Sequence, residues 1–287
     1  MITRSHGKLF RWYKTPGRKL CAAEAFLKTR ENYCVGASSR FLRLKKSLDH
    51  VWYMPDPEGG ISALILQSRQ VLFPVFDKIK NIPAPRFLNR FLGKVRIHAL
   101  QGLREDVELL ELLMENQRYY AAERIDYELM GLDSGPRPEA LRAGPANLVL
   151  RKPVVKDTEF LFALQSAYEQ EEVLPENTVF NPAVCRYNLE HILSSEQTLV
   201  AELDNQVVGK INTSARSFTR YQVGGVYVRP DYRGCGIAVK MTAVFVRDLL
   251  AQGKGVSLFV KKTNNAALKV YRKAGFAILA DYRITYY

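Results

Sequence analysis

The clearest pattern of apolar positions lies between residues 223 and 253, where strand spacing gives way to helical spacing. Val223, Val226 and Val228 are β-branched residues, which favour a strand. After a short polar stretch, apolar residues recur at helical spacing and form one broad face: Ile237, Val239, Met241, Val244, Phe245, Leu249 and Leu250. The pattern therefore predicts a strand, a tight turn and a helix that ends near Gly253.

The turn between this strand and helix carries the strongest chemical signal. Pro230 has no N–H to donate and ends the strand pairing. Gly234 and Gly236 allow backbone geometry and close approaches that a Cβ would block. Because the first N–H groups of a helix lack intrahelical partners, this turn predicts a phosphate site to which Arg233 adds a charge-assisted bond. An ordinary turn with glycines chosen for packing is the alternative.

The rest of the second half predicts a mixed sheet with helices. The expected elements are a strand at 148–150, helices at 158–171 and 185–193, a hairpin of 198–202 and 206–212 around Asp204-Asn205, and a strand at 257–261 followed by a helix from Asn265. Strands and helices therefore alternate, and the expected fold class is α/β or α+β.

The first half shows a similar order of elements. We expect helices at 18–30, 39–48 and 106–117, strands at 51–53, 61–67, 71–76, 95–100 and 124–129, a hairpin turn at Arg69-Gln70, a loop marked by Pro83 and Pro85, and a turn at Gly102. This order favours a degenerate copy of the second half, with an unrelated α/β module as the alternative. Turn-forming residues at 133–138 and Gly144-Pro145 then divide the chain into domains 1–132 and 147–287, joined by a linker at 133–146.

Composition narrows the class of protein. The 287 residues are 47% hydrophobic and 25% charged, as in a globular protein, and no apolar run suggests a membrane span or a signal peptide. Four cysteines without a C-x-x-C pair and four scattered histidines predict no metal site and a reduced, cytoplasmic setting.

The net charge of +13 is concentrated early in the chain. Twelve Lys and Arg residues lie between Arg4 and Lys46, against only Glu24 and Glu31. Such a stretch attracts phosphates, acidic proteins or nucleic acid, although no RNA-binding motif accompanies it. A solvated surface is the favoured interpretation, and nucleic acid stays a possible partner.

Two motifs in order resemble the GNAT N-acetyltransferases. Arg233-x-x-Gly236-x-Ala238 is similar to the family's Arg/Gln-x-x-Gly-x-Gly/Ala signature, with alanine in place of the last glycine. Downstream, Asn264-x-x-Ala267-x-x-x-Tyr271-x-x-x-Gly275-Phe276 resembles the family's later motif of a strand followed by a helix with Asn and Tyr. The resemblance implies two GNAT-like domains, each a mixed central sheet flanked by helices, with the C-terminal one intact.

The resemblance also implies a co-substrate, acetyl-CoA, and the residues that hold it. In the family the fourth strand pairs with the pantetheine arm and polarises the thioester, which places these groups at Val226, Tyr227 and Val228. The turn that holds the pyrophosphate corresponds to a run of six residues: Arg233, Gly234, Cys235, Gly236, Ile237 and Ala238.

The resemblance assigns a proton donor but no base. Tyr271 corresponds to the tyrosine that protonates the leaving thiolate, and Asn264 either bonds the pantetheine or caps the following helix. The fourth strand, 222–229, holds no acid, so the base is chosen from Glu171, Glu172 and Glu202, and we select Glu172. An amine that is already neutral would need no base.

The expected activity is transfer of an acetyl group to a primary amine of a small molecule or protein, by direct attack in a ternary complex. The segment 169–187 would set the acceptor, and four of its residues form an acidic patch that could attract a cationic amine: Glu169, Glu171, Glu172 and Glu176. An aminoacyl-tRNA-dependent transferase and a non-catalytic CoA-binding regulator are the alternatives.

Overall fold

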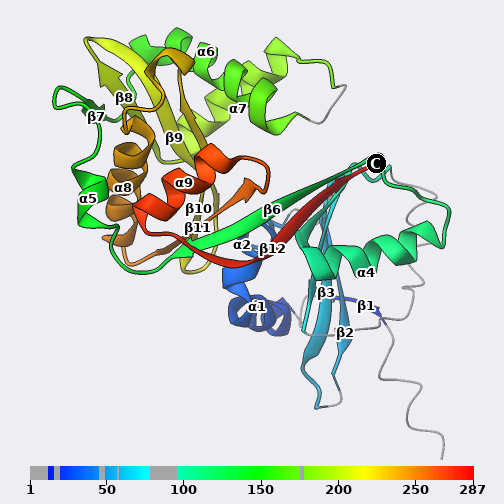
Figure 1. Cartoon of the computed structure of the whole chain (residues 1–287). Coiled ribbons are helices and arrows are strands. Elements are labelled where there is room, and N and C mark those ends of the chain that lie inside the picture. Colours follow the sequence, from blue (N-terminus) through cyan, green and yellow to red (C-terminus); the bar gives the residue numbers. More distant parts are fainter. Residues whose placement is uncertain (1–11, 16–19, 45–48, 57, 78–95, 175–177) are drawn as a thin grey trace, which may run out of the picture. The chain divides into compact units, whose positions relative to one another are not determined.

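The computed structural model describes residues 12–15, 20–44, 49–56, 58–77, 96–174 and 178–287 (Figure 1). The chain forms two compact units, the first made of Met1–Glu128 with Ala280–Tyr287 and the second of Leu129–Leu279. Several sequence expectations lie wholly or partly outside the described residues: the loop of Pro83 and Pro85, the start of the helix at 18–30, the end of the helix at 39–48, the start of the strand at 95–100, and Glu176.

The first unit is built on a mixed sheet. Its strands, in their order across the sheet, are β1 (Tyr13–Lys14), β2 (Asp49–Pro55), β3 (Ile61–Ser68), β4 (Val71–Phe76), β5 (Ala99–Leu103) and β12 (Ala277–Tyr286). The pairs β2–β3 and β3–β4 are antiparallel, β4–β5 is parallel, and β5–β12 is antiparallel. The last strand of the chain therefore completes the sheet of the first unit.

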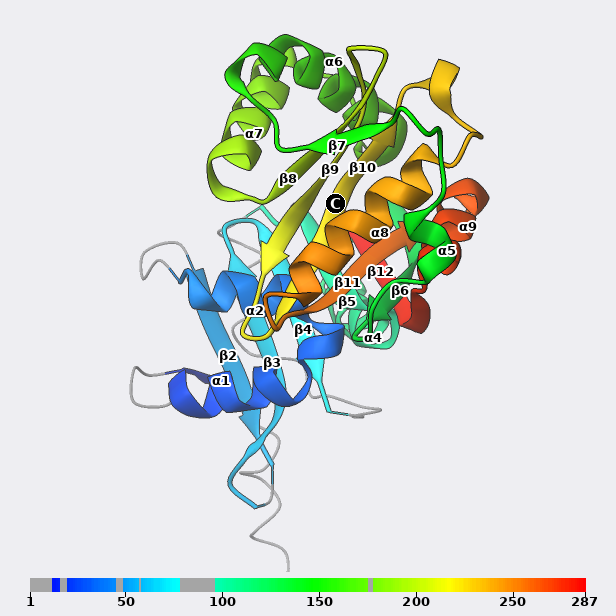
Figure 2. The same ribbon diagram turned by 90° about the vertical axis from the view of Figure 1, so that its left-hand side faces the viewer.

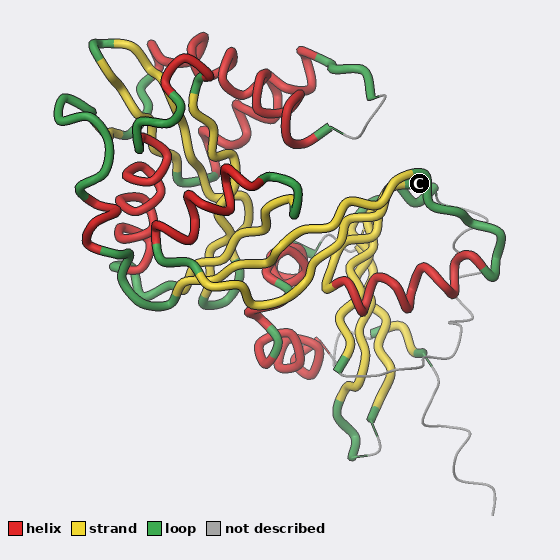
Figure 3. Tube along the Cα trace, viewed as in Figure 1, coloured by secondary structure: helices red, strands yellow, loops and turns green. Residues whose placement is uncertain are grey.

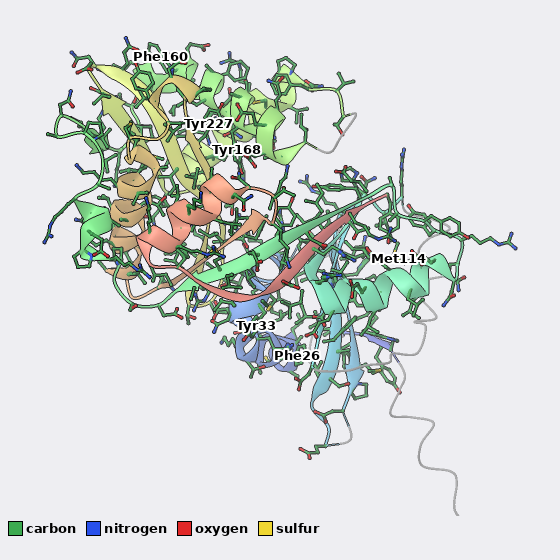
Figure 4. All side chains as sticks on the ribbon, viewed as in Figure 1. Phe26, Tyr33, Met114, Phe160, Tyr168 and Tyr227 are labelled. Atoms are coloured by element: carbon green, nitrogen blue, oxygen red, sulfur yellow. The ribbon has the colours of Figure 1, made fainter. Side chains whose placement is uncertain are left out.

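Helices cover both faces of this sheet. On one face α1 (Leu20–Thr29) and α2 (Val35–Leu42) contact β3, and on the other α4 (Arg104–Glu115) packs against β4 and β5. Figure 4 labels one residue from each side, Phe26 of α1 and Met114 of α4. The apolar face of α4 supplies Val107, Leu110 and Met114 to the core. β6 (Glu123–Leu132) follows α4 and has residues in both units.

Gly102 corrects one sequence expectation. It lies inside β5 and pairs with Arg283 of β12, so the predicted turn between a strand at 95–100 and a helix at 106–117 is wrong. A Cβ at Gly102 would lie 3.0 Å from the backbone oxygen of Pro74 on β4. The glycine thus serves a close approach of two strands, and α4 begins directly after β5 at Arg104.

The second unit has a sheet of similar topology. Its strands, in their order across the sheet, are β11 (Gly255–Lys261), β10 (Arg220–Val228), β9 (Gln206–Arg216), β8 (Thr198–Leu203) and β7 (Val149–Arg151). β10 and β11 are parallel and the other pairs are antiparallel. The predicted β8–β9 hairpin is confirmed, and Asp204 and Asn205 have the positive φ angles, 50° and 61°, that favour a tight hairpin turn.

Two layers of helices enclose the strands of the second unit (Figures 2 and 3). They comprise α6 (Thr158–Tyr168), the π-helix η4 (Glu169–Val173), α7 (Pro182–Ser195), α8 (Ile237–Leu250) and α9 (Asn265–Ala274), with the short α5 (Pro138–Leu141) beside α8. Side chains alternate across the sheet. Val200, Val207 and Tyr227 pack with α6 and α7, whereas their neighbours Ala201, Val208 and Val228 pack with α8 and α9.

The two units share much of their order of elements. Each has a first strand, a helical pair, three antiparallel strands, a further strand parallel to the third of these, and then a helix and a strand. The second unit has α8 between its two parallel strands, whereas in the first unit residues 78–95, between β4 and β5, lie outside the described part of the chain. By this pairing β4 is the counterpart of β10, and β5 the counterpart of β11. The predicted fold class, two mixed α/β domains, is confirmed. Among the described helices none is long and apolar enough to cross a membrane.

Candidate functional site

The parallel strands β10 and β11 part soon after they meet. Their paired residues run from Arg220 opposite Gly255 to Gln222 opposite Ser257. β10 then continues to Val228 and β11 to Lys261 without further pairing between them. The segment of β10 that the sequence assigns to the pantetheine arm, Val226 to Val228, lies in this separated part.

A glycine turn connects β10 to the start of α8. Gly234 and Gly236 both have positive φ angles, 84° and 86°, and a Cβ on Gly236 would come within 2.8 Å of the backbone nitrogen of Gly144. Gly236 is the N-cap of α8, and no side chain accepts a hydrogen bond there. Because N-terminal helix amides attract anions, the turn has the geometry of a phosphate site. The exposed Cys235 thiol donates to the backbone oxygen of Tyr232 at 3.0 Å.

Arg233 is held beside the turn by three contacts. Its Nε donates to the backbone oxygen of Val228 at 2.9 Å, its second terminal nitrogen donates to Glu171 at 2.9 Å, and its guanidinium lies over the Tyr227 ring at 5.1 Å. The Tyr227 hydroxyl also donates to Glu171, at 2.5 Å. Burial acts to raise the pKa of Glu171, but the bonds from Tyr227 and Arg233 outweigh it and hold that pKa below its usual value.

Three predicted site residues meet where η4 approaches α9. The Asn264 side-chain amide donates to Glu172 at 2.8 Å, and its oxygen accepts from the N–H of Ala267 at 2.9 Å. The expectation that Asn264 caps the helix is confirmed. Tyr271 is buried, with its ring edge-to-face against Phe276 at 5.9 Å. Burial raises the pKa of Tyr271, and nearby Tyr168 and Glu172 raise it further. Tyr271 therefore stays protonated at neutral pH.

A buried polar cluster beneath β10 was not predicted. β10 bulges between Gly224 and Tyr227, and Gly225 there has a φ of 59°. The Lys210 ammonium of β9 donates to the backbone oxygen of Gly225, and the Tyr168 hydroxyl of α6 accepts from the N–H of the same residue. Figure 4 shows Tyr168 beside Tyr227, and their ring centroids are 6.5 Å apart. One signal was available, since Lys210 is the only charge in the run 207–211 of an otherwise apolar strand.

The carboxylates of η4 each have a partner inside the protein. Glu169 accepts from Gln165 and Asn188, while Glu171 and Glu172 hold the contacts described above. The fourth member of the predicted acidic patch, Glu176, lies outside the described residues. π-helical turns are frequent at functional sites. This one directs Glu171 to Arg233 beside the glycine turn and Glu172 to Asn264, the cap of α9, while Glu169 is bound by α6 and α7. Glu202 instead pairs with Arg151 at 2.5 Å, on the β7–β8 side of the sheet.

The corresponding place in the first unit holds a buried carboxylate that binds the backbone of β4. β4 and β5 pair only at Val71 with Ala99 and Leu72 with Leu100 before they part. Beyond that point the buried Asp106 carboxylate of α4 accepts from the N–H of Phe76 at 3.1 Å. Asp106 also borders a small cavity that Arg30, Cys34 and Tyr282 help to line. Within the residues that the structure describes, no His, Cys, Asp and Glu side chains gather in a group of three that could hold a metal.

Comparison with known proteins identifies the second unit. The model of the acetyltransferase (GNAT) family matches residues 161–276, a range that includes η4, the glycine turn and α9. Residues 161–276 form a GNAT domain. A search of curated protein sequences found no match to the chain. The match to the family model confirms the resemblance to GNAT proteins that the sequence predicted.

Solved structures show that the GNAT fold extends over both units. A protein from Drosophila melanogaster is 11% identical, with a TM-score of 0.64 over 98% of this chain and 99% of its own. A tandem GNAT protein from the clavulanic acid biosynthesis pathway is 10% identical, with a TM-score of 0.60 over 96% of this chain and 97% of its own. A GCN5-related N-acetyltransferase from Sphaerobacter thermophilus is 16% identical, with a TM-score of 0.53 over 96% and 94%. The chain therefore has two GNAT-like domains, and its GNAT domain supports an acetyl-transfer activity.

Proposed function

We propose that the protein is an acetyl-CoA-dependent N-acetyltransferase that moves the acetyl group to a primary amine by direct attack in a ternary complex. The observation that carries the proposal is the glycine turn at the start of α8, which directly follows the part of β10 that β11 leaves unpaired. The turn would hold the pyrophosphate through the backbone from Arg233 to Ala238. The edge of β10 from Val226 to Val228, which β11 leaves unpaired, would pair with the pantetheine arm.

In this proposal the neutral amine of a small molecule or protein attacks the thioester carbon. The C–N bond forms, the C–S bond breaks, and the thiolate takes a proton from the hydroxyl of Tyr271. A backbone N–H of β10 stabilises the oxyanion, which is the largest electrostatic contribution in such sites. Burial keeps Tyr271 in its protonated form, which supports its assignment as the donor.

The proton released by the amine goes to Glu172 or to solvent, and the Tyr271 phenolate regains a proton from there before the next cycle. Glu172 accepts one hydrogen bond from Asn264, through Oε1, which fixes the carboxylate near Tyr271. Glu172 remains our choice among the acids of η4, because its charge acts on Tyr271, whereas Glu171 pairs with Arg233 and has a lowered pKa. The four cysteines are unpaired, which supports a reducing compartment such as the cytoplasm as the place of action.

Two matched glycine variants test the proposal. Gly234 and Gly253 lie beside opposite ends of α8, both have positive φ angles, 84° and 72°, and a Cβ on either meets nothing within 4 Å. Gly234→Glu and Gly253→Glu therefore carry similar strain, but only the first places a carboxylate at the proposed pyrophosphate site.

The measurement is thermal unfolding with and without acetyl-CoA. At 100 times its Kd the ligand stabilises by about 2.7 kcal/mol, which raises the Tm by several degrees. We expect this rise in the wild type and in Gly253→Glu, and its loss in Gly234→Glu. Equal shifts in all three proteins, or none in the wild type, would contradict the proposal. In the second case binding of tRNA would be measured next.

A further inference from the structure

Both backbone groups of Gly225, at the bulge of β10, are bound by side chains, one from β9 and one from α6. The Lys210 Nζ donates to the Gly225 oxygen at 3.1 Å and to Asn212 Oδ1 at 3.3 Å. The Tyr168 hydroxyl accepts from the Gly225 N–H at 3.3 Å, and the Lys210 ammonium lies 4.9 Å from the centre of the Tyr168 ring. Lys210 is 1% exposed, so this contact is fully enclosed.

The Lys210 charge is costly to bury, and its surroundings offset that cost only in part. Burial lowers the pKa of Lys210 to about 7, against an opposing effect of Glu169 on η4 and Cys185 on α7. Tyr168 on α6 and Cys185 have raised pKa values and stay neutral near pH 7, which leaves Glu169 as the nearby anion. An apolar residue at 210 would avoid this cost, which indicates that the ammonium group itself has a task.

That task follows from the covalent geometry of the bulge. The Gly225 oxygen and the Val226 N–H belong to one peptide group, and the chain has no cis peptide among its described residues. In a trans peptide the C=O and N–H point in opposite directions. A cation that binds the Gly225 oxygen therefore fixes the direction of the Val226 N–H, away from Lys210, and polarises it into a stronger donor.

We propose that Lys210 is a positioning residue of the acetyl transfer, which holds and polarises the Gly225–Val226 peptide so that the Val226 N–H stabilises the oxyanion of the acyl group. The inference rests on the proposed function, which assigns Val226 to the thioester. Lys210 does not touch the acetyl group, and it acts only through this peptide.

The test uses the full chain with acetyl-CoA labelled with ¹³C at the carbonyl carbon, because no acceptor is needed. A hydrogen bond to the thioester oxygen lowers the stretching frequency of that carbonyl in infrared difference spectra. The variant is Lys210→Met, which keeps the length of the side chain and removes the charge and the donors. The control is Lys254→Met, which removes another lysine bond to a backbone oxygen, that of Phe218 at 2.7 Å.

We expect Lys210→Met to bind acetyl-CoA with nearly unchanged Kd, because the glycine turn is intact, and to show a smaller lowering of the frequency than the wild type or Lys254→Met. With an amine acceptor in hand, its kcat would be about 10- to 100-fold lower, less than the loss from removing an oxyanion donor outright. An unchanged carbonyl frequency in Lys210→Met would overturn the inference, as would a Kd that weakens by the same factor as kcat.

The pH dependence gives a second measurement that needs no variant. Since the Lys210 charge is lost as the pH rises through about 7, the frequency lowering in the wild type should shrink between pH 5.5 and pH 8.5. If Lys210→Met does not fold, a frequency that is constant over this range overturns the inference. Failure of the proposed function is distinguishable, because in that case the wild type binds no acetyl-CoA and gives no bound carbonyl band at any pH.

Discussion

Tyr271, the proposed proton donor, is a buried side chain that keeps its proton at neutral pH. Its ring packs edge-to-face on Phe276, and its pKa is raised by burial, Tyr168 and Glu172. Tyr271→Phe keeps the ring and removes the proton, so we expect kcat to fall by about 10²–10³ with little change in the Kd for acetyl-CoA. Tyr120→Phe, at an exposed tyrosine outside the proposed site, is the control. Full activity of Tyr271→Phe would remove the phenol from the mechanism.

Asp106 makes the stability of the first unit depend on pH. Burial raises its pKa from 3.8 to about 7, despite the opposing bond from the Phe76 N–H. The folded state therefore binds more protons than the unfolded state between about pH 4 and pH 7, so the contribution of Asp106 to stability falls as the pH rises through this range. Asn in its place cannot ionise, and its side-chain oxygen can still accept from Phe76.

We compare the free energy of unfolding of Asp106→Asn with that of the wild type at two pH values. The difference in favour of the variant should be about 2–4 kcal/mol larger at pH 8 than at pH 5. Thermal unfolding at the two values measures this, with Asp231→Asn, at an exposed aspartate, as the control. A stability difference between Asp106→Asn and the wild type that does not change with pH would show that the Asp106 carboxyl keeps an ordinary pKa.

For individual residues, the sequence predicted those that belong to a motif and missed those that only the fold brings together. The glycine turn and Tyr271 follow from spacing along the chain. Lys210 and Tyr168 are 42 positions apart, and they meet only because α6 crosses β9 and β10. The lone charge in an apolar strand was the available signal, but a sequence does not reveal what such a charge contacts.

Among the elements, α9 depends on a cap that has two roles. Asn264 accepts from the Ala267 N–H and donates to Glu172. Asn264→Ala loses both contacts and should cost about 1 kcal/mol. Asn264→Ser keeps a capping oxygen and loses the amide donor. We therefore expect its thermal stability to match that of the wild type, while its kcat is as low as that of Asn264→Ala. Equal kcat in Asn264→Ser and the wild type would mean that the bond to Glu172 does not matter for the reaction.

Most helices and strands were predicted because their apolar spacing is regular. The parallel pairs were harder, because their pairing is not written in local spacing. The sequence interpretation aligned the segment 95–117 of the first half with β10, the glycine turn and α8 of the second half. The parallel strand pairs show instead that β4 is the counterpart of β10. Gly102 misled the interpretation because a glycine needed for close approach resembles a glycine needed for a turn.

For the whole molecule, the end of the chain stabilises the first unit. Ala280–Tyr287 belongs to that unit, where the largely buried Arg283 pairs with Asp126 at 2.7 and 3.1 Å and with Glu108 at 3.1 Å. The sequence boundaries of 1–132 and 147–287 stay a prediction about domains. No turn signal marks the point near Leu279 where the contacts of the chain change from one unit to the other.

Removing the Arg283 charge tests this role. Arg283→Met removes the largely buried charge of this cluster and leaves Arg104 to pair with Asp126 and Glu108, so it should lower stability by about 3 kcal/mol. Arg247→Met, which removes an exposed pair with Asp248, should change it by less than about 0.5 kcal/mol. Chemical denaturation measures both. A loss in Arg283→Met no larger than in Arg247→Met would show that this cluster contributes little.

The central claim is that this tandem protein holds one working acetyl-CoA site, in the second unit. In the first unit the Asp106 carboxylate accepts a hydrogen bond from the N–H of Phe76, which lies on β4, the counterpart of β10. The most direct measurement is a calorimetric titration of the full chain with acetyl-CoA, beside Gly234→Glu. The account predicts one molecule bound per chain and none in the variant. Two molecules per chain, or one that Gly234→Glu still binds, would contradict it.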